Sequence, residues 1–350
     1  MKRSGHVQVN EIDQSAKKNI RVRTGVAIGL VALLIPGIVF GGWVLFGIVA
    51  VSLGIAIFEI MRSPGKKIHW TAWVVAYLFG FLLAFWPLIR TNAGAAYIAH
   101  QHGQPAPGFV LEESFVGPAI PFIVIGVALF LFFMIAVLDK DLTFRDIAYL
   151  FGITMLVGFG FQAALFCRYA PEVFYAADAT YSIGGKVGQE LVDSSAFRYG
   201  LGGTLFVFCV LSSMLNDTFA FFGGMLFGKH KMNPRVSPKK TWEGFAFGVG
   251  GATAINLAIA FALAATGTPI LPILDMNHWY LIVILSILLP FFGTLGDLVF
   301  SLAKRGENLK DFGKLIPGHG GILDRVDSHL FSFLGTMLLI ALFTGGWLLW

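Results

Sequence analysis

Residues 310–328, KDFGKLIPGHGGILDRVDS, place charged side chains, a histidine and four glycines between two apolar stretches. The pairs Pro317-Gly318 and Gly320-Gly321 permit tight turns and a close approach of the backbone to a ligand, which phosphate-binding loops need. Asp324 and Asp327 are three residues apart, so both carboxylates point the same way if a helix begins there. The segment therefore predicts a site for a charged ligand.

Two further carboxylates fall inside apolar stretches. Asp297 begins a helical stripe with i, i+4, i+7, i+8 and i+11 spacing, which runs out of the bilayer through Ser301, Lys304, Arg305 and Asn308. Asp217, in SSMLNDTFAFFGG, shares a face with the small residues Ser213 and Gly224. Each could be a buried Asp that only pairs for packing. The cost of a charge at membrane depth favours a functional role instead.

The segment 228–244, GKHKMNPRVSPKKTWEG, carries five basic residues. The usual excess of basic residues in inner loops is enough to explain Lys229, Lys231 and Arg235. The stretch from Ser237 to Thr241 is the better candidate for phosphate binding. There Pro238 restrains the turn, and Lys239 and Lys240 supply two point charges.

Carboxylates clustered with Lys, Arg and a glycine-rich turn favour a divalent cation with phosphates, since Mg²⁺ takes one or two carboxylates together with phosphate oxygens and water. No Cys/His set predicts a zinc site, and no G-x-S-x-G turn predicts a serine nucleophile. The His100-x-His102 pair has no third ligand nearby, so an ordinary solvated loop is favoured there. The residues predict a metal-dependent reaction of a phosphate substrate at the inner membrane face.

Composition indicates what must position these residues. The 350-residue chain is 56% hydrophobic and 13% charged, against about 25% charged in soluble domains. Its mean hydropathy is +0.76. We therefore expect an all-α, polytopic integral membrane protein, with roughly 17–25 apolar residues per span. The nine candidate spans lie near 24–41, 43–60, 71–89, 118–138, 147–167, 200–227, 244–266, 279–301 and 328–349. The first two form one apolar run, which we expect to turn back at Gly41-Gly42.

The Lys and Arg residues predict the orientation. With a cytoplasmic N-terminus, all but four of the 25 lie in inner segments, and those four are Arg90, Arg168, Lys186 and Arg198. We expect a basic cytoplasmic tail over 1–23 that is not cleaved, an N-terminal membrane region over 24–199 and a catalytic membrane region over 200–350. The long outer loops are predicted at 90–117 and 168–199. Cys167 and Cys209 indicate no disulfide framework.

Two blocks resemble the phosphatidate cytidylyltransferase (CDP-diacylglycerol synthase) family. SLAKRGENLKDFGKLIPGHGGILDRVD, 301–327, is similar to the family signature, here S-x-x-K-R-x4-K-D-x6-G-H-G-G-x-x-D-R-x-D. NDTFAFFGGMLFGKHKMNPRVSPKKTWEG, 216–244, resembles a second family block, and Glu59 at the end of the second span also matches. The resemblance covers about 200–350.

The resemblance implies an enzyme of phospholipid biosynthesis that joins CTP and phosphatidic acid into CDP-diacylglycerol and pyrophosphate. It implies a multi-pass protein of the bacterial inner membrane, with its active site on the cytoplasmic face, contacts to membrane lipids and no nucleic-acid partner; a homodimer is left open. The implied cofactor is Mg²⁺, with K⁺ as a candidate second cation, held by Asp297, Asp324 and Asp327. The implied catalytic residues are Asp217, Lys304, Arg305, Lys310, Asp311 and His319. The implied substrate- and phosphate-binding residues are Ser237, Lys239, Lys240, Ser301, Gly320, Gly321 and Arg325.

Two alternatives belong to other classes. A polyprenol kinase or an archaeal-type CDP-lipid synthase would also use CTP, but neither shares the full signature. A transporter of an anionic solute could use an intramembrane Asp as an ion site. Transporters often show interrupted helices in two corresponding halves, whereas the charged features here gather in the last 150 or so residues, which favours an enzyme.

Overall fold

The computed structural model of this chain describes residues 29, 32–101, 120–178, 180–315 and 320–344. Residues 32–40 are helical. The helices that follow are α2 Gly42–Arg62, α3 Trp70–Gln101, α4 Ile120–Leu138, α5 Phe144–Ala177, α6 Gly188–Val192, a π-helical turn Phe197–Leu201, α7 Thr204–Phe227, α8 Trp242–Ala265, α9 Trp279–Gly306 and α10 Leu323–Phe343. The basic tail over 1–23, residues 24–28, 30 and 31 of the span predicted at 24–41, and His102 and His319 lie outside the described residues.

Six of these helices are long and apolar enough to cross a membrane, and α3 and α4 contain shorter apolar segments, Trp70–Trp86 and Phe122–Leu138. The expectation of a helical polytopic membrane protein is thereby confirmed. Each predicted span from 43–60 onward lies within or overlaps one of these helices. The predicted turn is also present, because Gly41 and Gly42 have φ values of 58° and 46°, a backbone conformation that glycine adopts without steric cost.

Two predicted loop boundaries are wrong, since α3 continues to Gln101 and α5 to Ala177. Apolar counting ends a span at Arg168, yet the α-helix continues past that residue. The Arg168 side chain is only 1% exposed, and its guanidinium donates to Glu172 Oε1 (2.8 Å), the Gly202 carbonyl (2.9 Å) and the Ile38 carbonyl (2.8 Å). A buried charge with such partners is compatible with a helix in an apolar environment.

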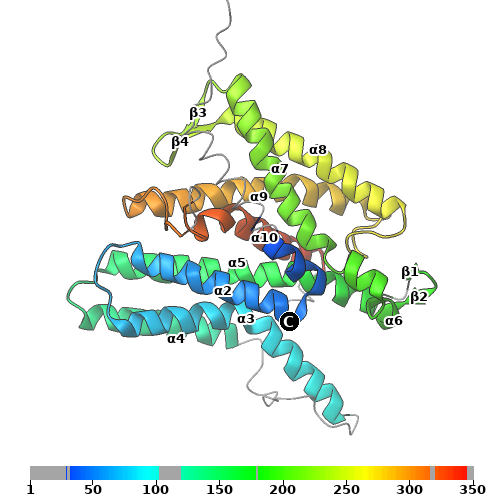
Figure 1. Cartoon of the computed structure of the whole chain (residues 1–350), viewed down its shortest axis with the longest axis horizontal. Helices are drawn as coiled ribbons and strands as arrows, with labels where there is room; N and C mark the ends of the chain where they lie inside the picture. Colours follow the sequence, from blue (N-terminus) through cyan, green and yellow to red (C-terminus); the bar gives the residue numbers. More distant parts are fainter. Residues whose placement is uncertain (1–28, 30–31, 102–119, 179, 316–319, 345–350) are drawn as a thin grey trace, which may run out of the picture.

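The helices pack as two groups that share α10 (Figure 1). In one group α3 packs against α2, α4 and α5, and in the other α7 packs against α8 and α9 packs against both α8 and α10. Leu330 of α10 belongs to the apolar core of the first group, whereas Phe333 and Ile340 belong to that of the second. Helix α10 therefore connects the N-terminal helices to those that carry the charged residues.

Two short antiparallel hairpins add to the expected all-α architecture. Strands β1 (Ser182–Ile183) and β2 (Lys186–Val187) join through Gly184-Gly185, both with positive φ, as a two-residue hairpin turn requires. Strands β3 (Lys231–Asn233) and β4 (Ser237–Thr241) form the second hairpin, and the Thr241 side chain caps the start of α8. The candidate phosphate-binding stretch therefore lies on a strand rather than in an open loop.

Candidate active site

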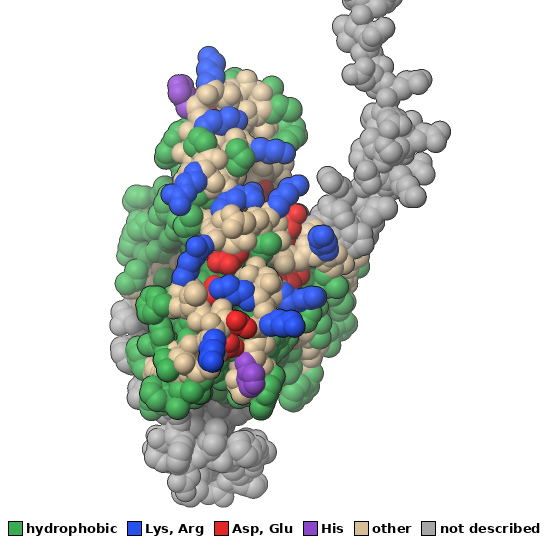
Figure 2. Space-filling model, turned by 90° about the vertical axis from the view of Figure 1, so that its left-hand side faces the viewer, with side chains coloured by type: hydrophobic (Ala, Val, Ile, Leu, Met, Phe, Trp, Pro, Cys, Tyr) green, Lys and Arg blue, Asp and Glu red, His purple; other side chains and the backbone are tan. Residues whose placement is uncertain are grey.

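Segments predicted to face the inner side lie together at one end of the molecule. Lys66 Nζ is 2.5 Å from Asp146 Oδ2, and Arg145 donates to the Gly306 carbonyl at the end of α9. Figure 2 shows this end, where basic side chains surround acidic ones. The tertiary structure thus brings the segments 61–70, 139–146, 228–243 and 302–315 to one face.

The β3–β4 hairpin is bound to helix α9 by two basic side chains. Lys240 Nζ is 2.5 Å from Asp297 Oδ2, and both side chains are partly exposed. Arg305 donates from Nε to the Val236 carbonyl (3.4 Å) and from Nη1 to the Leu309 carbonyl (2.7 Å). Two blocks that are separate in sequence therefore form one charged surface.

Lys304 lies inside the protein rather than at its surface. Its side chain is largely buried, and Nζ is 3.0 Å from Asp324 Oδ1 and 3.7 Å from Asp327 Oδ2. The same nitrogen lies 5.5 Å from the centre of the Phe312 ring, a cation–π geometry. The stripe read from the sequence thus divides, because Lys304 turns toward α10 while Arg305 turns toward the hairpin.

Asp324 organises the loop that precedes α10. Its Oδ2 accepts hydrogen bonds from the backbone N–H groups of Phe312 and Gly321, both at 2.9 Å. Gly320 has a φ of 85°, and a Cβ there would lie 2.8 Å from Asp324 Oδ2. Glycine at position 320 therefore serves both the backbone conformation and the close approach of the carboxylate.

Glu59 is a site residue whose role sequence reasoning missed. Its two carboxylate oxygens accept hydrogen bonds from the backbone N–H groups of Ile322 (3.0 Å) and Leu323 (2.9 Å), so the end of α2 caps the start of α10. A carboxylate is favoured there because the N-terminus of a helix carries partial positive charge. The signal in the sequence was a charged residue at the end of an apolar run. In the structure Glu59 is only 4% exposed.

Asp217 faces the same cluster from α7. It lies on an exposed face of that helix and interacts electrostatically with Asp297, Lys240 and Arg325. Asp327 is likewise subject to repulsion from Asp297. The carboxylates of α7, α9 and α10 therefore share one region. In the part of the chain that the structure describes, no three His, Cys, Asp or Glu side chains form a ready-made metal-ligand group.

Comparison with known proteins places this arrangement in a family. A family model described as "Cytidylyltransferase family" matches residues 20–343. The chain belongs to the cytidylyltransferase family. Proteins named phosphatidate cytidylyltransferase are similar to it. That of Bacillus subtilis (strain 168) is 43% identical over 147 residues, which cover 42% of this chain and 50% of that protein.

The corresponding protein of Staphylococcus haemolyticus (strain JCSC1435) is 42% identical over 132 residues, 38% of this chain and 46% of that protein. The chain thus spans about half the length of the curated relatives it matches.

The other residues predicted for this cytidylyltransferase-family site differ in their contacts and in their exposure. Ser301 Oγ donates to Asp297 Oδ1 at 3.3 Å, which supports that carboxylate. Ser237 begins β4 and is partly buried. Four charged side chains are exposed, namely Lys239, Lys310, Asp311 and Arg325.

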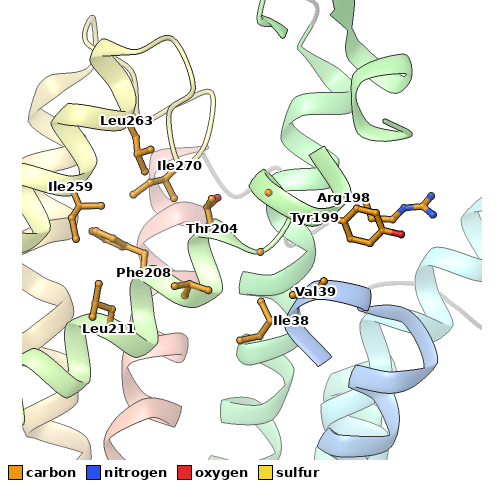
Figure 3. A pocket seen from close by; sticks show the side chains of 13 residues that line it. Ile38, Val39, Arg198, Tyr199, Thr204, Phe208, Leu211, Ile259, Leu263 and Ile270 are labelled. Carbon is orange, nitrogen blue, oxygen red and sulfur yellow. The ribbon is translucent and has the colours of Figure 1, made fainter. Parts of the chain in front are cut away.

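Two cavities differ in their relation to the carboxylates. One, of about 300 Å³, lies at the start of α7, away from the carboxylates, and Figure 3 shows its largely aliphatic lining from Ile38, Leu211 and Ile259. Arg198 lies at its edge with the guanidinium directed away from it (Figure 3). The other, of about 760 Å³, is lined by Glu59 and Phe312, beside the loop that Asp324 holds. Of these two cavities, the larger one lies beside the charged residues of the candidate active site.

Proposed function

We propose that this protein transfers the cytidylyl group of CTP to phosphatidate, giving CDP-diacylglycerol and pyrophosphate. The observation that carries the proposal is the 2.5 Å contact between Lys240 and Asp297, because it unites the two charged blocks at the end of the membrane helices. Membership of the cytidylyltransferase family and the names of the relatives support the same reaction.

In this proposal a phosphatidate oxygen attacks the α-phosphorus of CTP, and the bond from that phosphorus to the pyrophosphate oxygen breaks. The attacking phosphomonoester is already anionic, so a covalent enzyme intermediate is not needed. Positioning and charge neutralisation supply most of the catalysis in such transfers. Lys239, Lys240 and Arg305 would neutralise the CTP phosphates, and Arg305, as a planar fork, would also fix their orientation.

We expect the reaction to need Mg²⁺, with K⁺ as a candidate second cation. The argument for Mg²⁺ is the chemistry of the donors, because α7, α9 and α10 pack against one another and carry carboxylates, whose oxygens Mg²⁺ prefers. A complete protein shell is not required, since Mg²⁺ keeps several waters and takes phosphate oxygens from its substrate. Asp324 is buried and bound by two backbone N–H groups as well as by Lys304, whereas Asp297 is partly exposed and bound by the side chains of Lys240 and Ser301, which a cation could displace. We therefore propose Asp297 and Asp327 as the main ligands. The cation would supply charge to offset that developing on the phosphates.

We further propose that the charged end faces the cytoplasm, where CTP is available, in a bacterial inner membrane. The supporting argument is that the basic segments gather at that end, as the positive-inside rule predicts for the cytoplasmic side. Phosphatidate would then arrive from the bilayer and CTP from the aqueous side. A homodimer remains a prediction from the sequence, to be tested by cross-linking in native membranes.

The decisive experiment follows the products of CTP. Purified protein in lipid nanodiscs receives labelled CTP, phosphatidate and Mg²⁺, each omitted in turn. The proposal expects pyrophosphate and CDP-diacylglycerol only when all three are present. Release of CDP with no pyrophosphate would indicate a CTP-dependent lipid kinase. Movement of an anion across proteoliposomes without product would indicate a transporter, and either result would overturn the proposal.

A further inference from the structure

The larger cavity is a groove whose walls come from distant parts of the chain. Helix α2 supplies one wall with Val51, Ile55 and Phe58, and Tyr77 of α3 adds to it. The opposite side is the segment 312–315 that follows α9. The groove encloses about 760 Å³, within the range of roughly 300–1,000 Å³ that small-molecule sites occupy.

The groove changes from apolar to basic along its length. Val51 and Phe58, on the membrane-spanning part of α2, are 63% and 43% exposed. Arg62 lies in the last turn of the same helix, with its guanidinium carbon 5.2 Å from the centre of the Phe58 ring. Lys314 is exposed on the opposite side. An apolar wall that ends in two cations suits a ligand with a hydrocarbon tail and an anionic head.

The groove also adjoins the candidate active site. Phe312 lines the groove, and its ring faces Lys304 Nζ, which holds Asp324 and Asp327. Glu59, another lining residue, caps the helix that carries both of these carboxylates. A headgroup at the basic end of the groove would therefore lie beside the loop that Asp324 holds, next to the charged cluster.

We propose that this groove binds phosphatidate as the acceptor, with an acyl chain along Val51, Ile55 and Phe58 and the phosphomonoester between Arg62 and Lys314. The inference rests on the proposed cytidylyl transfer and adds the place and the recognising residues for the lipid. A nucleoside triphosphate would not suit the apolar wall, because each of its three phosphates needs hydrogen-bond donors or cations. A neutral lipid would leave both cations without a partner.

The headgroup contact is tested with Arg62→Ala and Lys314→Ala, and Lys140→Ala serves as an exposed basic control from the α4–α5 turn. Each groove variant should raise KM for phosphatidate on the order of tenfold, the effect of losing one charge-assisted hydrogen bond. KM for CTP should not change. Labelling by a photoreactive phosphatidate in the absence of CTP should fall in parallel. If wild-type protein makes CDP-diacylglycerol and neither variant changes KM for phosphatidate or the labelling, the groove assignment fails while the enzyme function stands.

The acyl contact is tested by filling the groove at Gly54. A Cβ at Gly54 would make ordinary contacts of 3.9 and 4.0 Å with Phe81 and Tyr77, so a side chain can begin there without a clash. The control is Gly47→Leu, in the same helix and with open space beside it. Gly54→Leu should slow turnover of long-chain phosphatidate severalfold more than that of a short-chain analogue. Equal slowing of both substrates, or no slowing, would overturn the acyl assignment.

Discussion

The Lys240 amine and the Asp297 carboxylate lie 2.5 Å apart, although all of helix α8 separates them in sequence. Their side chains are 25% and 31% exposed, so a ligand can reach both groups. The pair joins the β3–β4 hairpin to the start of the polar stripe on α9. In the mechanism that we propose, a phosphate that bound Lys240 would release Asp297 for a cation, and nucleotide binding would then be coupled to metal binding.

The first prediction concerns the carboxylates that we assign to the cation. Asp297→Asn and Asp327→Asn should each lower turnover by about a hundredfold at saturating Mg²⁺, as loss of transition-state charge stabilisation would. Asp275→Asn, in the α8–α9 connection, is the control. As a second readout, Mg²⁺ with CTP should raise the unfolding temperature of wild-type protein but not of these two variants. Near-normal turnover of both variants would refute the assignment.

Asp324 is predicted to act mainly through the loop it holds. Asp324→Asn weakens the acceptance of two backbone N–H groups and the ion pair with Lys304. We expect a loss of about 1–3 kcal/mol in the free energy of unfolding together with loss of turnover. Denaturant titration in detergent, compared with Asp297→Asn, measures the difference. Equal stability of the two variants would contradict this role.

Glu59 is predicted to be a positioning residue. Glu59→Ala leaves the first N–H groups of α10 without their acceptors and should cost about 1–3 kcal/mol of stability. Glu59→Gln keeps one acceptor oxygen and should restore a part of both stability and turnover. The exposed Glu190→Gln is the control. A Gln variant no better than the Ala variant would show that capping is not the reason Glu59 matters.

Substitution of Lys304 and of its neighbour Arg305 should have different effects on stability and turnover. Lys304→Ala leaves Asp324 and Asp327 without their shared cation, which for a broken buried ion pair costs about 3–5 kcal/mol. Arg305→Ala alters an exposed side chain and should lower turnover with little change in unfolding temperature. Arg305→Lys should not restore turnover, because an ammonium lacks the planar fork. Full activity of Arg305→Lys would show that only the positive charge of Arg305 is needed.

The orientation is tested by cysteine labelling in sealed vesicles. Arg235→Cys, Lys67→Cys and Lys140→Cys should all react from one side, which we propose is the cytoplasm, and Lys186→Cys from the other. Cys167 and Cys209 are buried, so the native background should be low. Labelling of position 235 from the side that labels position 186 would refute the common face. Labelling of the three only from outside would reverse the orientation.

Much of this protein could be predicted from its sequence because the signals are local. Apolar runs predict membrane helices wherever lipid is the solvent, and the i, i+4, i+7 spacing predicts that Asp297, Ser301 and Lys304 share one face of a helix. The hydrogen bond from Ser301 to Asp297 follows from that spacing. Two compact blocks with fixed polar positions were enough to indicate the cytidylyltransferase family, which the family match confirms.

Tertiary structure alone decided how those residues meet. Glu59 accepts a hydrogen bond from Ile322, 263 positions away, and no periodicity within α2 predicts that contact. Lys304 and Arg305 differ by one position, yet Lys304 points toward α10 and Arg305 toward the hairpin, because consecutive residues on a helix point about 100° apart and different elements pack on each side. Spacing along one helix determines which side chains share a face, but the packing of neighbouring helices determines what that face contacts.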